Sequence, residues 1–231
     1  MNTQRIAAVL FTPILLVAGC GVNKSIHIAD GETVSGGKAT VNGSVRIGSD
    51  CTVDGSCRTV NGRVTVGSNS EVGSLQTVNG AVKIANDVTV SGDVGTVNGS
   101  ITLAENTSVD GEVETVNGSV HCASGGTISS NSTTVNGSIE LMRTEVGGDL
   151  STVNGSVILR DNSRVTGNVV IKGKNRRGAR KKDVEILISD GSVVEGNVIV
   201  ADEARIVKVI LSGGGKVMGR VKNAEVVERD S

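Results

Sequence analysis

The chain of 231 residues has no Trp, no Tyr, one Phe and one Pro. The single Phe and the single Pro are Phe11 and Pro13, so both lie near the N-terminus. Without Trp or Tyr the chain cannot stack such rings on sugars or on unpaired bases, which argues against a lectin and a nucleic-acid binder. Val, Ile and Leu must build the core instead, and 32 Gly without Pro-rich segments argue against collagen and stiff linkers.

Recognisable catalytic patterns are also missing. The sequence has no P-loop, no nucleophile elbow and no paired catalytic carboxylates. His27 and His121 are isolated in the sequence, and we expect both to be exposed bystanders. Several acidic residues form a stripe whose spacing matches no calcium-binding loop: Asp93, Asp110, Glu112, Glu114 and Asp149. We therefore expect no enzyme activity, no cofactor and no metal site.

The N-terminus reads as an export signal. Met1–Arg5 is polar with one positive charge, and Ile6–Val17 is an apolar run too short to span a bilayer comfortably. The run ends in Leu-Val-Ala-Gly-Cys, which resembles the lipobox of bacterial lipoproteins. That resemblance implies removal of residues 1–19, lipidation of Cys20 and a lipidated tether over residues 20–25. An ordinary secretory signal with a chance Cys is the alternative.

The residue after the lipobox suggests a destination. Gly21, not Asp, follows Cys20. In a Gram-negative envelope the sorting convention for lipoproteins then favours the outer membrane. We therefore expect a protein anchored to a membrane of the bacterial cell envelope through its lipid.

A repeat fills the rest of the chain. Thr-Val-Asn-Gly occurs seven times at spacings of 18 or 19 residues, and the copies begin at Thr40, Thr59, Thr77, Thr96, Thr115, Thr134 and Thr152. The unit is shorter than two-helix repeats and rich in Val, Thr and Gly, so it predicts strands and turns. In the unit at residues 96–114, three turn segments divide the apolar positions: Asn98-Gly99, Ala104-Glu105-Asn106 and Asp110-Gly111-Glu112.

Three faces and three corners per unit predict one coil of a solenoid. We expect an all-β, single-stranded, triangular parallel β-helix of about ten coils over residues 26–231. Residues 40–170 form the Thr-Val-Asn-Gly coils and 183–223 the C-terminal coils of one domain. Gly and Asn are expected to supply left-handed or bulged backbone at the corners. The apolar spacing is not a clean hexad, which favours a right-handed coil.

Stacking gives the repeated residues their roles. Successive coils lie about 4.8 Å apart, so each side chain recurs over its counterpart. Inward Val, Ile and Leu then form columns. The repeated Asn residues are expected to form a structural amide ladder: Asn42, Asn61, Asn79, Asn98, Asn117, Asn136 and Asn154.

The Thr-Val-Asn-Gly-Ser-Val/Ile runs resemble the bacterial adhesin-like family of envelope β-solenoid proteins. The resemblance covers Thr40 to about Val170 and implies a structural or adhesin-like role. Val90–Val94 and the C-terminal coils also resemble bactofilins, right-handed triangular β-helices that polymerise end to end. Bactofilins generally lack a lipobox, so the lipobox-like residues 16–20 argue against a cytoskeletal role.

One basic segment interrupts the repeat. Between positions 172 and 182 the chain carries seven basic residues and no acid: Lys172, Lys174, Arg176, Arg177, Arg180, Lys181 and Lys182. The coil that contains it is about ten residues too long, so the excess must loop outward. This loop is a candidate site for lipid head groups, lipopolysaccharide or an acidic wall polymer. The alternative is a solvated insertion.

Three Cys remain after the lipobox. Cys57 and Cys122 fall at inward positions and read as small core residues. Cys51 and Cys57 flank a corner in an exported protein, which leaves a disulfide between them open.

The whole pattern predicts a non-enzymatic, lipid-anchored envelope scaffold. Its partner would be an envelope protein, an anionic lipid or a polysaccharide. End-to-end self-association through the solenoid ends is the alternative.

Overall fold

The computed structural model describes residues 23–173, 184–202 and 205–229. These residues form 31 strands and no helix. The strands assemble into three parallel sheets of eleven, ten and ten strands. Each coil adds one strand to each sheet in turn, so the fold is a triangular parallel β-helix of ten complete coils with one further strand. The predicted fold class is confirmed.

The first sheet contains the strand that follows each Asn-Gly corner. Its strands are β1 (Ile26–Ile28), β4 (Val45–Ile47), β7 (Val64–Val66), β10 (Val82–Ile84), β13 (Ile101–Leu103), β16 (Val120–Cys122), β19 (Ile139–Met142), β22 (Val157–Arg160), β25 (Val184–Ile188), β28 (Val207–Ser212) and β31 (Glu225–Arg229).

The second sheet contains the strand that comes next in each coil, after the corner that ends the first-sheet strand. Its strands are β2 (Thr33–Ser35), β5 (Thr52–Asp54), β8 (Glu71–Val72), β11 (Thr89–Val90), β14 (Ser108–Val109), β17 (Thr127–Ile128), β20 (Glu145–Val146), β23 (Arg164–Val165), β26 (Val193–Val194) and β29 (Lys216–Val217).

The third sheet completes each coil, and six of its ten strands end at the Thr of a Thr-Val-Asn-Gly repeat. Its strands are β3 (Lys38–Thr40), β6 (Cys57–Thr59), β9 (Leu75–Thr77), β12 (Val94–Thr96), β15 (Val113–Thr115), β18 (Ser132–Thr133), β21 (Leu150–Thr152), β24 (Val169–Ile171), β27 (Val198–Val200) and β30 (Val221–Lys222).

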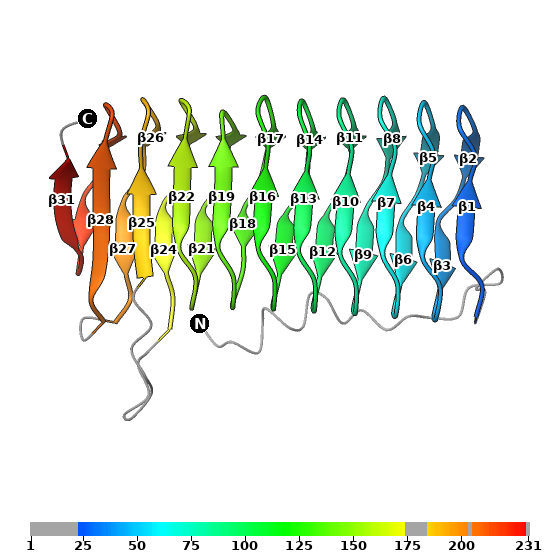
Figure 1. Cartoon of the computed structure of the whole chain (residues 1–231), viewed down its shortest axis with the longest axis horizontal. Coiled ribbons are helices and arrows are strands. Elements are labelled where there is room, and N and C mark those ends of the chain that lie inside the picture. Colours follow the sequence, from blue (N-terminus) through cyan, green and yellow to red (C-terminus); the bar gives the residue numbers. More distant parts are fainter. Residues whose placement is uncertain (1–22, 174–183, 203–204, 230–231) are drawn as a thin grey trace.

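The path of the chain sets the hand of the coil. In Figure 1 the near strands of the first sheet run upward, the chain returns downward on the far side, and successive coils advance from right to left. This is a right-handed coil, as the irregular apolar spacing predicts. The result is a rod on the order of 50 Å long.

The core consists of stacked apolar columns. Val82 pairs with Val64 on one side and with Ile101 on the other, and all three are fully buried. The same in-register pairing holds along the other inward positions. Each such side chain contributes about 1.5–3 kcal/mol of burial free energy before its lost entropy is subtracted.

The amide ladder is present in the structure. Asn98 donates through Nδ2 to Oδ1 of Asn79 at 2.8 Å, and Asn117 does the same to Asn98. Equivalent bonds of 2.7–2.8 Å link the remaining members, Asn42, Asn61, Asn136 and Asn154. The ladder extends one step further to Asn23, which accepts from Asn42. The amides therefore serve the stacking of the coils.

The reason for Gly in the repeat differs from the expected one. Gly99 does not adopt a left-handed backbone; a Cβ there would overlap the carbonyl group of Gly80 in the preceding coil. Left-handed residues instead occupy the corner between the first and second sheets, where Asp50, Asn69 and Asp87 have φ of 58°, 56° and 57°. The Asn-Gly corner thus needs Gly because two coils approach closely there, whereas the expected left-handed backbone is found at the other corner, for example at Asn69.

Candidate functional site

The outward side chains of the first sheet form one column along the rod. In its N-terminal part the register stacks His27, Arg46, Thr65 and Lys83. Lys24 and Arg63, also exposed, lie just before strands β1 and β7. No acidic residue occurs in residues 23–28, 42–47, 61–66 or 79–84, which form this part of the rod. The face is therefore locally basic.

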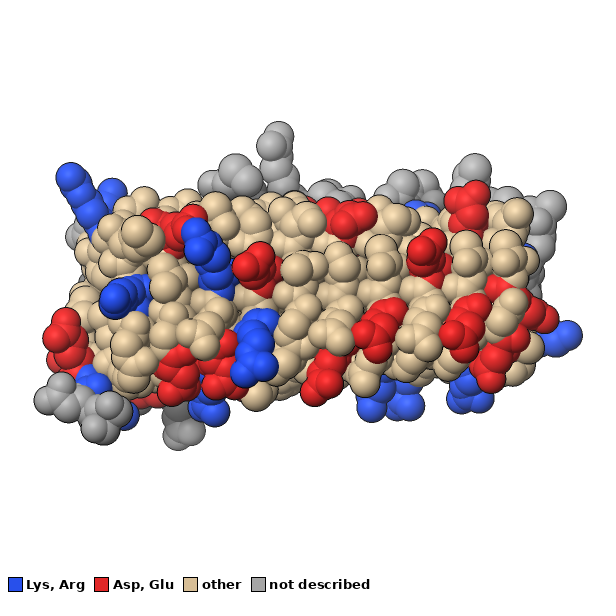
Figure 2. Space-filling view, turned by 90° about the horizontal axis from the view of Figure 1, so that it is seen from above, with Lys and Arg blue, Asp and Glu red and all other residues tan. Residues whose placement is uncertain are grey.

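The neighbouring surface has the opposite charge. Over the first five coils, the second sheet and the corners on either side of it contain ten acidic residues and no Lys or Arg: Asp30, Glu32, Asp50, Asp54, Glu71, Asp87, Asp93, Glu105, Asp110 and Glu112. In Figure 2 the right-hand, N-terminal half of the upper surface shows acidic side chains, and Lys and Arg project only at its margins. The rod therefore carries its charges on separate faces, which creates a transverse field.

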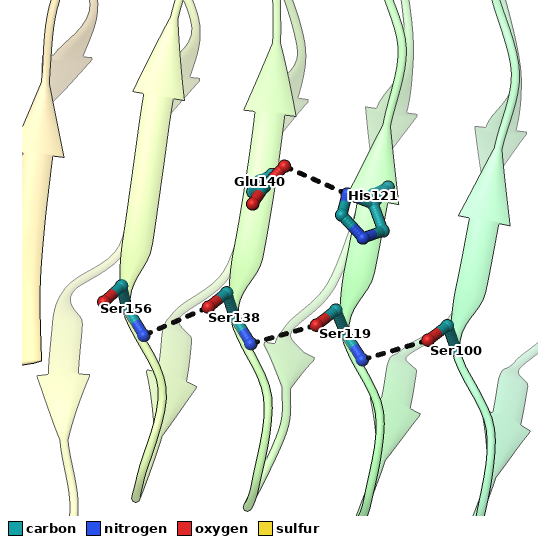
Figure 3. Close-up of polar contacts among 6 residues, drawn as sticks. All are labelled: Ser100, Ser119, His121, Ser138, Glu140 and Ser156. Carbon is teal, nitrogen blue, oxygen red and sulfur yellow. Dashed lines mark hydrogen bonds and ion pairs between the residues drawn. The ribbon is translucent and has the colours of Figure 1, made fainter. Parts of the chain in front are cut away.

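Further along the first sheet, two charged side chains meet across adjacent coils. His121 and Glu140 are register partners on β16 and β19, and His121 Nδ1 lies 3.1 Å from Glu140 Oε2 (Figure 3). Their side chains are 45% and 44% exposed. His121 is therefore outward-facing, as expected, but it is not isolated.

The pair lies in a shallow groove of about 370 Å³. The small side chains of Ala104 and Ala123 line the groove, together with Met142, Ile158 and Arg160. Nearby Ser119 and Ser138 belong to a second ladder, in which the Ser138 N–H donates to Ser119 Oγ at 3.2 Å (Figure 3). These hydroxyls thus serve the stacking of the corner. The groove therefore presents an imidazole–carboxylate pair beside apolar side chains, a surface that could contact another macromolecule.

The predicted basic loop falls largely outside the described residues. Lys174, Arg176, Arg177, Arg180, Lys181 and Lys182 are in that position, and so is the lipidation candidate Cys20. Lys172 is described, and its charge acts on Glu114. Burial raises the pKa of Glu114, Glu112 and Asp93 raise it further, and Lys172 lowers it.

The three Cys in the described part of the chain, Cys51, Cys57 and Cys122, are free and buried. Burial raises the pKa of the Cys57 thiol, against a lowering contribution from Lys38. Burial alone raises the pKa of Cys122 to about 12. Both thiols therefore stay protonated near neutral pH. Cys51 Sγ contacts the carbonyl oxygen of Ala29 at 3.1 Å, a weak hydrogen bond between coils.

The described residues also lack two other kinds of feature. No three His, Cys, Asp or Glu side chains gather there in a way that could hold a metal ion. Within the same ranges, no helix has the length and apolarity needed to cross a bilayer.

The chain matches no protein-family model, no curated protein and no solved structure in our comparisons. Its function therefore has to be inferred from its own residues.

Proposed function

We propose that this protein is a non-enzymatic, lipid-anchored scaffold of the bacterial cell envelope. The observation that carries the proposal is the unbroken register from β1 to β31, which arranges outward side chains in columns along a rod. Such a surface is extended and repetitive. It suits an elongated partner better than a small substrate that needs a pocket.

The anchor rests on the lipobox-like residues 16–20. The first strand begins at Ile26, so lipidation at Cys20 leaves a tether of few residues and holds the first coil close to the bilayer. Two or three acyl chains give stable anchoring where one does not. The resemblance of the repeats to adhesin-like envelope solenoids agrees with a role in contact.

Envelope fractionation tests the proposal. We expect the wild-type chain to take up radiolabelled palmitate and to require detergent for release, whereas Cys20→Ser should remain unlabelled. Cys122→Ala is the matched control, because it removes a buried core thiol and should keep the label. Equal labelling of wild type and Cys20→Ser would refute the anchor.

Crosslinking then tests the scaffold role. A photo-crosslinking residue at Thr102, outward on the first sheet, should capture an envelope component in intact cells. The same residue at Thr127, outward on the second sheet, is the control. Capture from neither position would contradict a scaffold that works through its faces, and turnover of a substrate by the purified rod would contradict the non-enzymatic assignment.

The C-terminal end favours a second candidate, end-to-end assembly. At this end Met218 and Val226 are 72% and 45% exposed, and β31 pairs on one side only, with β28. An unpaired strand edge beside exposed apolar side chains is a template for another chain. Under this alternative, sedimentation should show filaments that grow with protein concentration and that Val226→Lys abolishes. A rod that stays monomeric at all concentrations would exclude it.

A further inference from the structure

We propose that a groove on the N-terminal half of the first sheet binds the phosphate groups of anionic lipids and lays the rod against the membrane. The inference rests on the lipid anchor proposed above, because the anchor supplies the surface. The groove differs from the basic segment 172–182. The cationic residues that line it are Arg46 and Arg63, and Lys83 lies beside it on the next coil.

The groove itself has about 490 Å³ and lies between the Asn ladder and the outward column of the first sheet. Arg46 and Arg63 line it together with the hydroxyl groups of Ser44 and Thr65. The ladder amides Asn61 and Asn79 also line it. Guanidinium, hydroxyl and amide groups are all donors to phosphate oxygens, and Arg can bind them in a bidentate manner.

Within the described ranges, the cations of this face have no acidic partner. Lys24, Arg46, Arg63 and Lys83 are exposed, and none has a carboxylate within 4.0 Å among the described residues. Arg164, in contrast, pairs with Glu195 further along the rod. Arg46 and Arg63 lie on neighbouring coils, about 5 Å apart along the axis, and Lys83 lies one coil beyond. The spacing allows one phosphate to meet more than one cation.

Arg63 is also a departure from the repeat. Its position in the coil is normally Ser, whose hydroxyl accepts a hydrogen bond from the next coil; Ser44 Oγ accepts the Arg63 N–H at 3.3 Å in this way. Arg63 and then Ala81 have no hydroxyl, so the N–H groups of Ala81 and Ser100 lose that side-chain acceptor. The Ser ladder resumes at Ser100 and Ser119. The Ser ladder is thus interrupted at Arg63 and Ala81, and both residues line the groove.

The position of the groove selects a membrane surface over a soluble polyanion. It lies on the coils nearest to the proposed anchor at Cys20. The acidic second sheet faces another direction, so an anionic surface would attract one side of the rod and repel the other. When the basic face lies against the membrane, the other two faces of the rod remain accessible to partners.

Vesicle co-sedimentation tests this inference with the full-length Cys20→Ser chain, which removes the contribution of the lipid. Vesicles of phosphatidylglycerol mixed with phosphatidylcholine should bind the chain, and added salt should weaken the binding. Pure phosphatidylcholine vesicles should not bind it. The triple variant Arg46→Glu, Arg63→Glu, Lys83→Glu should lose affinity by about tenfold or more.

The matched control is Lys208→Glu, Lys216→Glu, Lys222→Glu, which makes the same change of charge on exposed positions of the C-terminal coils. It should bind within about twofold of the parent chain. Circular dichroism and thermal unfolding check that both variants fold, and Arg63→Ser, which restores the repeat, gives a second variant with an expected partial loss. Equal losses in the two triple variants would overturn the assignment to this groove.

Two further outcomes separate the alternatives. Binding of a soluble acidic polysaccharide through the same residues, without binding to phosphatidylglycerol vesicles, would overturn the lipid assignment. If wild-type fractionation shows no anchor while the Cys20→Ser chain still binds vesicles through the groove, the proposed anchoring fails and the lipid-binding groove stands as a peripheral membrane site. If the anchor is present and vesicle binding is absent, the groove assignment fails alone.

Discussion

The hydroxyl of Thr96 donates a hydrogen bond of 2.8 Å to the carbonyl oxygen of Gly80 in the preceding coil. Thr115 makes the same bond to Gly99, and Thr134 to Gly118. The Thr of the repeat is therefore an inward residue that also holds the Asn-Gly corner below it. This explains why the position is Thr and not Val, although its methyl group packs into the interior.

Thr96→Val should reveal the value of this bond. The substitution keeps the shape and removes the donor, so the Gly80 carbonyl loses a partner. We expect the free energy of unfolding to fall by about 1–3 kcal/mol. Chemical denaturation measures the change. Thr96→Ser keeps the donor, and Thr102→Val on the outward face is the control for a hydroxyl outside the core. A loss as large at Thr102 as at Thr96 would show that the buried bond contributes nothing particular.

Gly99→Ala tests the close approach of the corners. The added Cβ would meet the backbone of Gly80 and push the two coils apart. We expect a loss of several kcal/mol in the free energy of unfolding, or failure to fold, as for overpacking against a fixed neighbour. Gly126→Ala is the matched control, because its Cβ would have no neighbour closer than 3.4 Å and its backbone is not left-handed. If both variants unfold alike, steric contact is not the reason for Gly at the corner.

Asn98→Ala tests the amide ladder. The variant loses the bond to Asn79 and the bond from Asn117, each 2.8 Å long. These amides are exposed, so we expect a moderate destabilisation of about 1–2 kcal/mol by thermal or chemical unfolding. Glu105→Ala, at an exposed corner position of the same coil, is the control. A loss at Asn98 no greater than at Glu105 would mean that water replaces the ladder without cost.

The fold was predictable because one spacing serves several functions at once. The interval from Asn79 to Asn98 in the sequence equals the length of one hydrogen-bonded turn in the structure. A regular interval therefore predicts both the stacking and the ladder. Asn23 escaped this reasoning because Gly21 and Lys24 stand where the repeat has Thr and Gly, although Asn23 accepts from Asn42 as the later members do from their neighbours.

The surface sites were harder to predict because they join different coils. His121 and Glu140 are nineteen residues apart, and their contact follows only from the register of β16 and β19. The groove between Arg46 and Arg63 has the same origin. The signal was present in the sequence, since residues one repeat apart stack on each other. Reading it required knowing which positions face outward, and the corner lengths had to be known first.

The buried thiols give a prediction about reactivity. In the Cys20→Ser chain, Cys51, Cys57 and Cys122 should react with a thiol reagent at neutral pH only after the protein unfolds, because all three are buried. Colorimetric titration before and after denaturation measures this. Release of three thiols on unfolding shows that Cys51 and Cys57 are unpaired, and release of one shows a disulfide between them. A thiol that reacts rapidly in the folded protein would contradict the buried columns.

Cys122 also predicts how stability depends on alkaline pH. Its pKa rises from 9.0 to about 12 on burial, so the folded protein keeps the proton while the unfolded chain releases it. Because the pKa is higher in the folded state, the contribution of the protonated Cys122 thiol to stability is complete below pH 9. This contribution is lost as the pH rises toward 12. The free energy of unfolding should therefore fall over this range. It should fall less steeply for Cys122→Ala, although this variant is less stable at neutral pH. Parallel curves for the two proteins would show that this thiol does not ionise on unfolding.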